Sequence, residues 1–164
     1  MRARPIRVYL DSNVLIAYVA DEEGRAGVVQ SVLEDARQEK IDLITSVLSI
    51  TEVAYISTDQ AGDDPVGSQD AIDQLWVPAS PISVVDVSAR VALEARAIVR
   101  QSKGPGTRVV KPADAIHLAS ASIQQCDRLF TYESESTRRQ WEGLVHVRVA
   151  EPFLDEPRLD IGET

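Results

Sequence analysis

The N-terminal segment 8–16 constrains the fold more than any other part of this chain. A short apolar run stops at Asp11-Ser12-Asn13, and a second apolar run with a different spacing follows. Near-continuous apolar residues that end at a carboxylate are typical of a strand buried on both faces. The segment therefore predicts a strand over 6–10 and, directly after it, a helix over about 14–20 that Ser12 or Asn13 caps. Asp11 is then expected at the carboxyl end of a buried strand.

The rest of the chain alternates short aliphatic runs with segments of helical spacing. Further strands are predicted at 41–45, 82–86, 129–131 and 145–149. Such alternation predicts a parallel sheet with helices on both faces. With 164 residues, 44% of them hydrophobic, the chain can bury a substantial core in one domain. We expect an α/β fold, a single-domain three-layer sandwich with a central, mostly parallel sheet. The domain is expected over 1–150, followed by an acidic C-terminal tail over 151–164.

The charge balance argues against a general nucleic-acid binder, because the net charge is −9 and phosphate affinity rests mainly on Lys and Arg. The acids are unevenly distributed, however. Residues 151–164 carry five acids and one arginine, whereas residues 95–113 carry five basic side chains and no acid. That basic segment runs directly into Asp114. Local contact with phosphates therefore stays compatible with the sequence.

The cysteine count and the hydropathy pattern indicate the compartment. Cys126 is the single cysteine, so the chain has no intrachain disulfide and no zinc cluster of cysteines. No apolar run approaches the length of a membrane span, and no signal-peptide core follows Arg2 and Arg4. We expect a soluble cytoplasmic protein that does not enter the membrane.

Four acids deserve joint consideration, although each has an ordinary explanation by itself. Asp11 and Asp114 suit helix starts, Glu52 suits the solvent side of a helix, and Glu133 suits a polar surface. Taken together, Asp11 and Glu133 each follow a predicted strand, and the other two lie near helix starts. In open α/β sheets the carboxyl ends of the strands line the ligand crevice. The four acids are therefore expected to converge there.

A divalent metal ion would make such a cluster stable. Several carboxylates in one crevice repel one another unless a cation neutralises them. Oxygen ligands without His or Cys favour Mg²⁺ or Mn²⁺ over zinc. An ion of this kind suits the hydrolysis of phosphate esters, since it activates water and offsets charge on the phosphoryl oxygens.

Four motifs resemble those of the PIN-domain ribonucleases, and especially the VapC-type toxins of type II toxin–antitoxin systems. They are Leu10-Asp11-Ser12-Asn13, Ser49-Ile50-Thr51-Glu52-Val53, Lys111-Pro112-Ala113-Asp114-Ala115-Ile116-His117-Leu118-Ala119 and Phe130-Thr131-Tyr132-Glu133. The resemblance extends over nearly the whole chain, and the third motif is the most specific. The fourth departs from the family pattern, which usually has Asp where this chain has Glu133.

The resemblance implies a set of site residues. Asp11, Glu52 and Asp114 would be catalytic metal ligands, completed by Glu133 or, in its place, Glu135. Asn13 and Thr131 would orient the acids by hydrogen bonds. Arg108 and Lys111 would bind flanking phosphates, or else be solvated loop charges. His117, within a helix of the pattern, is interpreted as a packing or surface residue.

The implied function is a metal-dependent endoribonuclease that cleaves RNA with Mg²⁺ or Mn²⁺. It would be a toxin neutralised by a cognate antitoxin, and a homodimer is usual in that family. Two alternatives stay open. The chain could be a weakly active or inactive PIN module that serves as an RNA-binding or assembly subunit, as Glu133 and the net acidity suggest. An acid-cluster phosphatase is less favoured, since no second Asp stands two residues after Asp11. The RNA target and the number of ions stay open.

Overall fold

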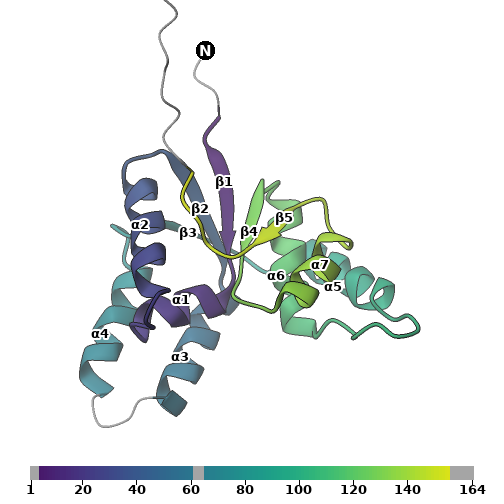
Figure 1. Cartoon of the computed structure of the whole chain (residues 1–164), viewed down its shortest axis with the longest axis horizontal. Helices are drawn as coiled ribbons and strands as arrows, with labels where there is room; N and C mark the ends of the chain where they lie inside the picture. Colours follow the sequence, from purple (N-terminus) through teal and green to yellow (C-terminus); the bar gives the residue numbers. More distant parts are fainter. Residues whose placement is uncertain (1–3, 61–64, 156–164) are drawn as a thin grey trace, which may run out of the picture.

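A five-stranded parallel sheet forms the centre of the protein. The structure, a computed structural model, describes residues 4–60 and 65–155. The strand order is β3-β2-β1-β4-β5, and every neighbouring pair is parallel (Figure 1). The strands are β1 (Ile6–Leu10), β2 (Ile41–Ser46), β3 (Ile82–Val85), β4 (Arg128–Phe130) and β5 (Arg148–Ala150). The predicted α/β class and parallel sheet are confirmed, and β1 lies in the middle of the sheet.

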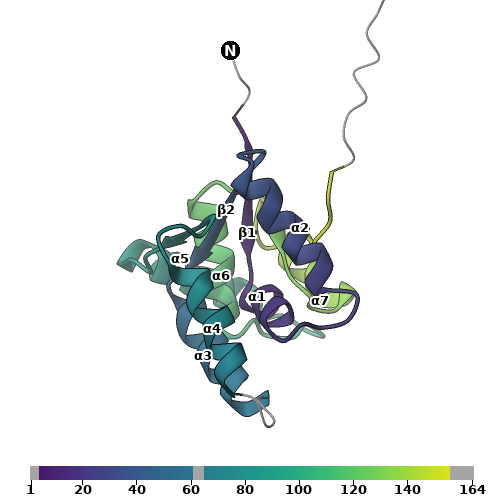
Figure 2. The same cartoon turned by 90° about the vertical axis from the view of Figure 1, so that its left-hand side faces the viewer.

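Helices cover both faces of this sheet, which gives the three predicted layers. Helices α1 to α4 lie on one side of β1, and α5 to α7 lie on the other (Figures 1 and 2). Their bounds are α1 (Ser12–Val19), α2 (Ala26–Arg37), α3 (Leu48–Gln60), α4 (Pro65–Trp76), α5 (Ala89–Gln101), α6 (Pro112–Ile123) and α7 (Glu135–Glu142).

The hydrophobic core is divided by the sheet into two clusters. Val8 and Leu10 of β1 pack on the side of α1 and α2, whereas Tyr9 packs on the side of α5 and α6. This follows from the alternation of side chains along a strand, and it explains why β1 needs apolar residues at successive positions. Burying each large aliphatic side chain contributes about 1.5–3 kcal/mol relative to exposure. The central strand is thereby held on both faces.

The predicted starts of the first helix and of the last strand differ from those in the structure. The helix after β1 begins at Ser12 rather than near residue 14, and Asp11 is its N-cap in place of Ser12 or Asn13. The last strand begins at Arg148 rather than 145, although the side chains of Val145 and Val147 are buried. The apolar alternation at 145–149 predicts which side chains are buried, but it does not predict where pairing begins, because that depends on the adjacent strand β4.

The segment after β5 carries no helix or strand in its described part, residues 151–155. Arg128 of β4 forms an ion pair with Asp155 at 2.9 Å and lies over the ring of Phe153. The remainder of the predicted acidic tail lies outside the described residues, so the domain boundary at 150 stays a prediction. Within residues 4–60 and 65–155, no helix is long and apolar enough to cross a membrane.

Candidate active site

Asp11 occupies the junction between the central strand and α1. Its backbone N–H continues the β1–β4 ladder by donating to the Phe130 carbonyl at 3.0 Å. Its carboxylate accepts a hydrogen bond from the Ser12 backbone N–H at 2.8 Å through Oδ1, and the residue is only 5% exposed. Asp11 therefore caps α1, which is the ordinary explanation of an Asp at this position. Its second oxygen, Oδ2, faces the end of β4.

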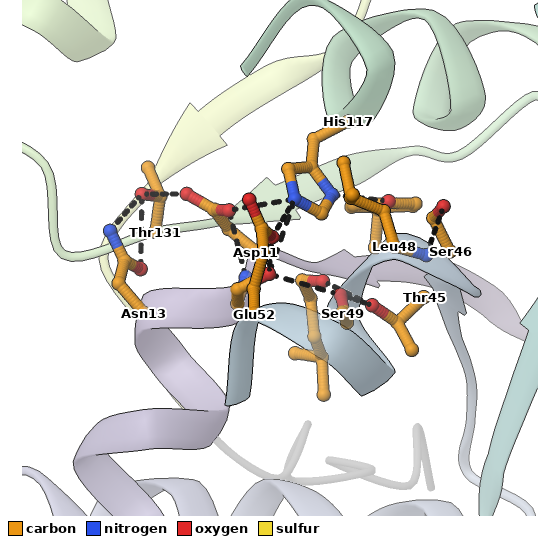
Figure 3. Close-up of polar contacts among 12 residues, drawn as sticks. Asp11, Asn13, Thr45, Ser46, Leu48, Ser49, Glu52, His117 and Thr131 are labelled. Carbon is orange, nitrogen blue, oxygen red and sulfur yellow. Dashed lines mark hydrogen bonds and ion pairs between the residues drawn. The ribbon is translucent and has the colours of Figure 1, made fainter. Parts of the chain in front are cut away.

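That second oxygen is held by the polar pair predicted to orient the acids. Thr131 Oγ1 donates to Asp11 Oδ2 at 2.7 Å, and Asn13 Nδ2 donates to Thr131 Oγ1 at 3.0 Å (Figure 3). Asn13 Oδ1 also accepts from the backbone N–H of Tyr132 at 3.0 Å. Residues from α1 and from the end of β4 are thus joined through Asp11. This places Asn13 and Thr131 as the sequence predicts, while their contribution to catalysis stays a prediction.

Asp114 lies in the first turn of α6, which Pro112 begins as predicted. Burial, the charge of Asp11 and the charge of Glu133 raise the pKa of Asp114 from 3.8 to about 6. His117 and Lys111 act in the opposite direction and do not offset the rise. The charges of Asp11 and Glu133 therefore both act on Asp114 and outweigh those of His117 and Lys111.

Glu133 is half-buried just after β4, and its backbone N–H donates to Thr131 Oγ1 at 3.2 Å. Glu135, the alternative fourth acid, is exposed in the first turn of α7 and forms an ion pair with Arg139 one turn later. Glu133 is among the charges that raise the pKa of Asp114, after burial and Asp11, and Glu135 is not. Glu133 therefore stays the better candidate for the fourth acid, and its role as a ligand stays a prediction.

Glu52 enters the site from α3 with its carboxylate already engaged. Glu52 Oε2 lies 2.7 Å from His117 Nε2 of α6 and also accepts a hydrogen bond from Ser12 Oγ (Figure 3). Although burial by itself acts to raise the pKa of Glu52, the hydrogen bonds from His117 and Ser12 lower it below its ordinary value. Glu52 is therefore an ionised carboxylate at neutral pH.

His117 is the residue of this site that the sequence did not reveal. Its side chain is 1% exposed and contacts Glu52, Ser12 and the Tyr9 hydroxyl, the last at 2.7 Å from Nδ1. His117 is therefore a packing residue and not a surface residue, the first of the two interpretations from the sequence. Its hydrogen bonds to Glu52, Ser12 and Tyr9 were not predicted. The available signal was a polar residue three positions after Asp114 on a helix face that otherwise carries Ala and Leu.

The two predicted phosphate-binding residues are both exposed, and one of them, Lys111, acts on an acid of this site. Lys111 is exposed at the N-cap of α6, close enough for its charge to act on Asp114. Arg108 is exposed in the preceding loop, where its backbone carbonyl accepts a hydrogen bond from Gln140 at 2.6 Å. Contact of either residue with a substrate stays a prediction.

The chemistry of these donors fits a hard divalent cation. Asp11, Asp114 and Glu133 offer only carboxylate oxygen, and burial, followed by the charges of Asp11 and Glu133, raises the pKa of Asp114. Within the described residues, no group of three or more His, Cys, Asp and Glu side chains is arranged as a metal cage. The Oε2 atom of Glu52 is already bonded to His117 and Ser12, whereas Asp11, Asp114 and Glu133 are the other carboxylates that could bind a cation at this site.

Comparison with protein families gives a match to the PIN domain over residues 8–140. This range begins inside β1 and ends inside α7, so it includes all four acids. No curated protein sequence matches the chain.

Several solved structures have a similar fold. VapBC2 from Rickettsia felis, bound to a promoter DNA fragment, matches with a TM-score of 0.68 at 12% identity over 89% of this chain and 98% of that chain. VapC20 from Mycobacterium tuberculosis, a toxin that cleaves the sarcin–ricin loop, matches with a TM-score of 0.62 at 15% identity over 86% and 98%. FitAcB from Neisseria gonorrhoeae matches with a TM-score of 0.63 at 17% identity over 88% and 97%. At these identities the likeness shows the fold.

Proposed function

Because the chain belongs to the PIN-domain family, we propose that it is a metal-dependent endoribonuclease that hydrolyses phosphodiester bonds of RNA. The observation that carries this proposal is the shared environment of Asp11, Asp114 and Glu133 at the carboxyl ends of β1 and β4, beside the start of α6. The negative charge gathered there is costly without a cation. A surface used only for protein contact would not need this group of acids.

The roles of the residues follow from their positions. Asp11 is a rigid ligand, because Ser12 N–H and Thr131 Oγ1 fix both of its oxygens. Asp114 and Glu133 approach from α6 and from the end of β4, and Glu52 contributes from α3. A bound Mg²⁺ or Mn²⁺ would activate water for attack on phosphorus and offset charge on the phosphoryl oxygens. Lys111, whose charge acts on Asp114, and Arg108 of the preceding loop would bind phosphates that flank the scissile bond.

The biological role that we propose is that of a toxin held inactive by a cognate antitoxin. Its support is the fold, which is similar to that of the toxin VapC20 and to a toxin–antitoxin complex from Klebsiella pneumoniae, as well as to VapBC2 and FitAcB. The net charge of −9 suits a basic segment of such a partner and would mainly raise the rate of association. A homodimer and a cytoplasmic location belong to the same proposal. The location is supported by the buried, unpaired thiol of Cys126.

Cleavage of RNA tests this proposal. Single-stranded and structured RNAs are incubated with the purified protein in Mn²⁺, in Mg²⁺ or in EDTA, beside Asp11→Asn, Glu133→Gln and Glu135→Gln variants. We expect cleavage that EDTA abolishes, that Asp11→Asn lowers by at least about 100-fold, and that Glu135→Gln leaves unchanged. If Asp11→Asn cleaves as fast as the parent protein, the assignment is wrong. Turnover of a small phosphomonoester without RNA cleavage would favour the phosphatase alternative.

A second candidate is a PIN module with weak or no activity, which binds RNA or assembles with other proteins. The Glu at position 133, where the family pattern usually has Asp, and the net charge of −9 favour it. Calorimetry separates the two. A folded protein with all four acids intact that binds no Mn²⁺ supports this candidate, whereas binding together with cleavage supports the nuclease.

A further inference from the structure

We propose that His117 is a positioning residue that, fixed by Tyr9, presents the carboxylate of Glu52 to the metal site. This inference rests on the proposed nuclease function and deepens it, because it explains how a residue of α6 sets the orientation of a ligand carried by α3. The two residues are 65 positions apart in the chain, and their side chains meet between the two helices (Figure 3).

Both ring nitrogens of His117 have polar partners inside the core. Nδ1 lies 2.7 Å from the Tyr9 hydroxyl, and Nε2 lies 2.7 Å from Glu52 Oε2 and 3.2 Å from Ser12 Oγ. His117 is 1% exposed and Tyr9 is 0% exposed. A buried imidazole is costly unless both nitrogens are satisfied, so this ring can take few other orientations. The ring plane is thereby locked.

The partners also assign the proton on the ring. A carboxylate only accepts hydrogen bonds, so the nitrogen that faces Glu52 must carry a proton. Tyr9 has a hydroxyl whose proton is available to Nδ1, since burial and the nearby charge of Asp11 raise the pKa of that phenol. The Nε2–H form of His117 therefore satisfies all three side chains. Glu52 thus requires the form that donates from Nε2, and the Tyr9 hydroxyl satisfies Nδ1 of the same ring.

A second donor, adjacent to His117, holds the same oxygen of Glu52. Ser12 Oγ donates to the same oxygen, Glu52 Oε2, and lies 3.1 Å from Ser49 Oγ. Ser49 is in turn 2.7 Å from Thr45 Oγ1, which donates to the Leu10 carbonyl at the end of β1. Through this series of hydroxyls the orientation of Glu52 is tied to the central strand. In the described part of the chain, the hydrogen bonds to this carboxylate go to Oε2, which leaves Oε1 for a ligand role.

His117 acts through Glu52 and not on the substrate. A general base must reach the proton that it removes, whereas this imidazole is enclosed and its Nε2 is committed to Glu52. Its distance to Asp11 Oδ1, 3.8 Å, exceeds that of a good hydrogen bond. His117 therefore supports the acids from behind, on the side away from solvent.

Calorimetric titration of the full chain with Mn²⁺ tests this role, with His117→Leu, His117→Gln and Tyr9→Phe variants. His117→Leu removes the donor and is expected to weaken Mn²⁺ binding by about 10- to 100-fold. His117→Gln places an amide N–H near the former Nε2 and should bind within about threefold of the parent protein. Tyr9→Phe should weaken binding by less than His117→Leu does. The control is His146→Leu at the exposed second histidine, which should change nothing.

Nitrogen NMR of the metal-free protein gives an independent readout. We expect a proton on Nε2 of His117 in the parent protein and also in Tyr9→Phe, because Glu52 still faces that nitrogen. An unprotonated Nε2 overturns the proposal, as does Mn²⁺ binding by folded His117→Leu that equals or exceeds that of the parent protein. If His117→Leu does not fold, His117→Gln and Tyr9→Phe decide by the same criteria. A parent protein that binds no Mn²⁺ refutes the nuclease function itself, whereas a parent that binds with unaffected variants refutes only the role of His117.

Discussion

Replacing Asp114 by asparagine should stabilise the metal-free protein, although it removes a residue that we assign to the active site. Burial, Asp11 and Glu133 raise the pKa of Asp114 from 3.8 to about 6. Such a rise corresponds to at most about 3 kcal/mol of cost for ionising the group in the folded state, at about 1.4 kcal/mol for each pKa unit. Because Asp114 is only half-buried, water screens part of this, and about 1–2 kcal/mol is the expected gain for Asp114→Asn at pH 7.

The gain should depend on pH in a defined direction. The folded protein holds the Asp114 proton more tightly than the unfolded chain, because the folded pKa, about 6, lies above the ordinary value of 3.8. The contribution of protonated Asp114 to the free energy of unfolding is therefore fully present below about pH 4 and is lost as the pH rises through about 6. Asp114→Asn does not titrate, so its advantage should be near zero at pH 4 and reach its full size above pH 6.

Urea unfolding in EDTA at several pH values measures this difference, and thermal unfolding should show a rise in Tm of about 2–6 °C at pH 7. Added Mn²⁺ should reverse the order, because it stabilises the wild type through binding and Asp114→Asn less. The matched control is Glu135→Gln, which removes one acid from an exposed ion pair. Equal or lower stability of Asp114→Asn at pH 7 without metal, or a difference independent of pH, would refute the electrostatic account of the site.

Three further changes test other parts of the structure. Thr131→Val removes the donor to Asp11 Oδ2, so Mn²⁺ affinity measured by calorimetry should fall by at least about 10-fold; unchanged affinity would argue against a supporting role. Leu129→Ala opens a cavity at a fully buried position of β4 and should cost about 2–5 kcal/mol in urea unfolding, and a cost below 1 would contradict the core described above. Lys111→Ala should raise KM for RNA and reduce its salt dependence with kcat unchanged, and a lower kcat alone would contradict phosphate binding.

The sequence predicted those parts of the fold that depend on local patterns. Strand β1 was found because burial on both faces requires successive apolar residues, and the start of α6 was found because Pro112 suits the first turn of a helix. In the region before β3, the local pattern of glycine, proline and acidic residues predicts a helix only from about residue 69, whereas α4 begins at Pro65. A helix start that depends on tertiary packing is not encoded in local propensity alone.

The candidate site shows the same division. Asp11, Asp114 and Glu133 are brought together by strand and helix ends, and the order of these elements is visible in the sequence. The contact between His117 and Glu52 joins α6 to α3 and has no local pattern. Sequence reasoning treated Asp11 as either a helix cap or a ligand, although the structure gives its two oxygens separate partners. A residue that serves both purposes is missed when the alternatives are weighed as exclusive.

Anomalous scattering from crystals grown with Mn²⁺ tests the central claim, that these acids form a metal centre, most directly. The account predicts a manganese peak about 2.1–2.2 Å from carboxylate oxygens of Asp11 and Asp114, with Glu133 close by and Glu52 still bonded to His117. The peak should vanish in Asp11→Asn. A protein that cleaves RNA with no peak at these carboxylates, or with its manganese bound elsewhere, would contradict the account.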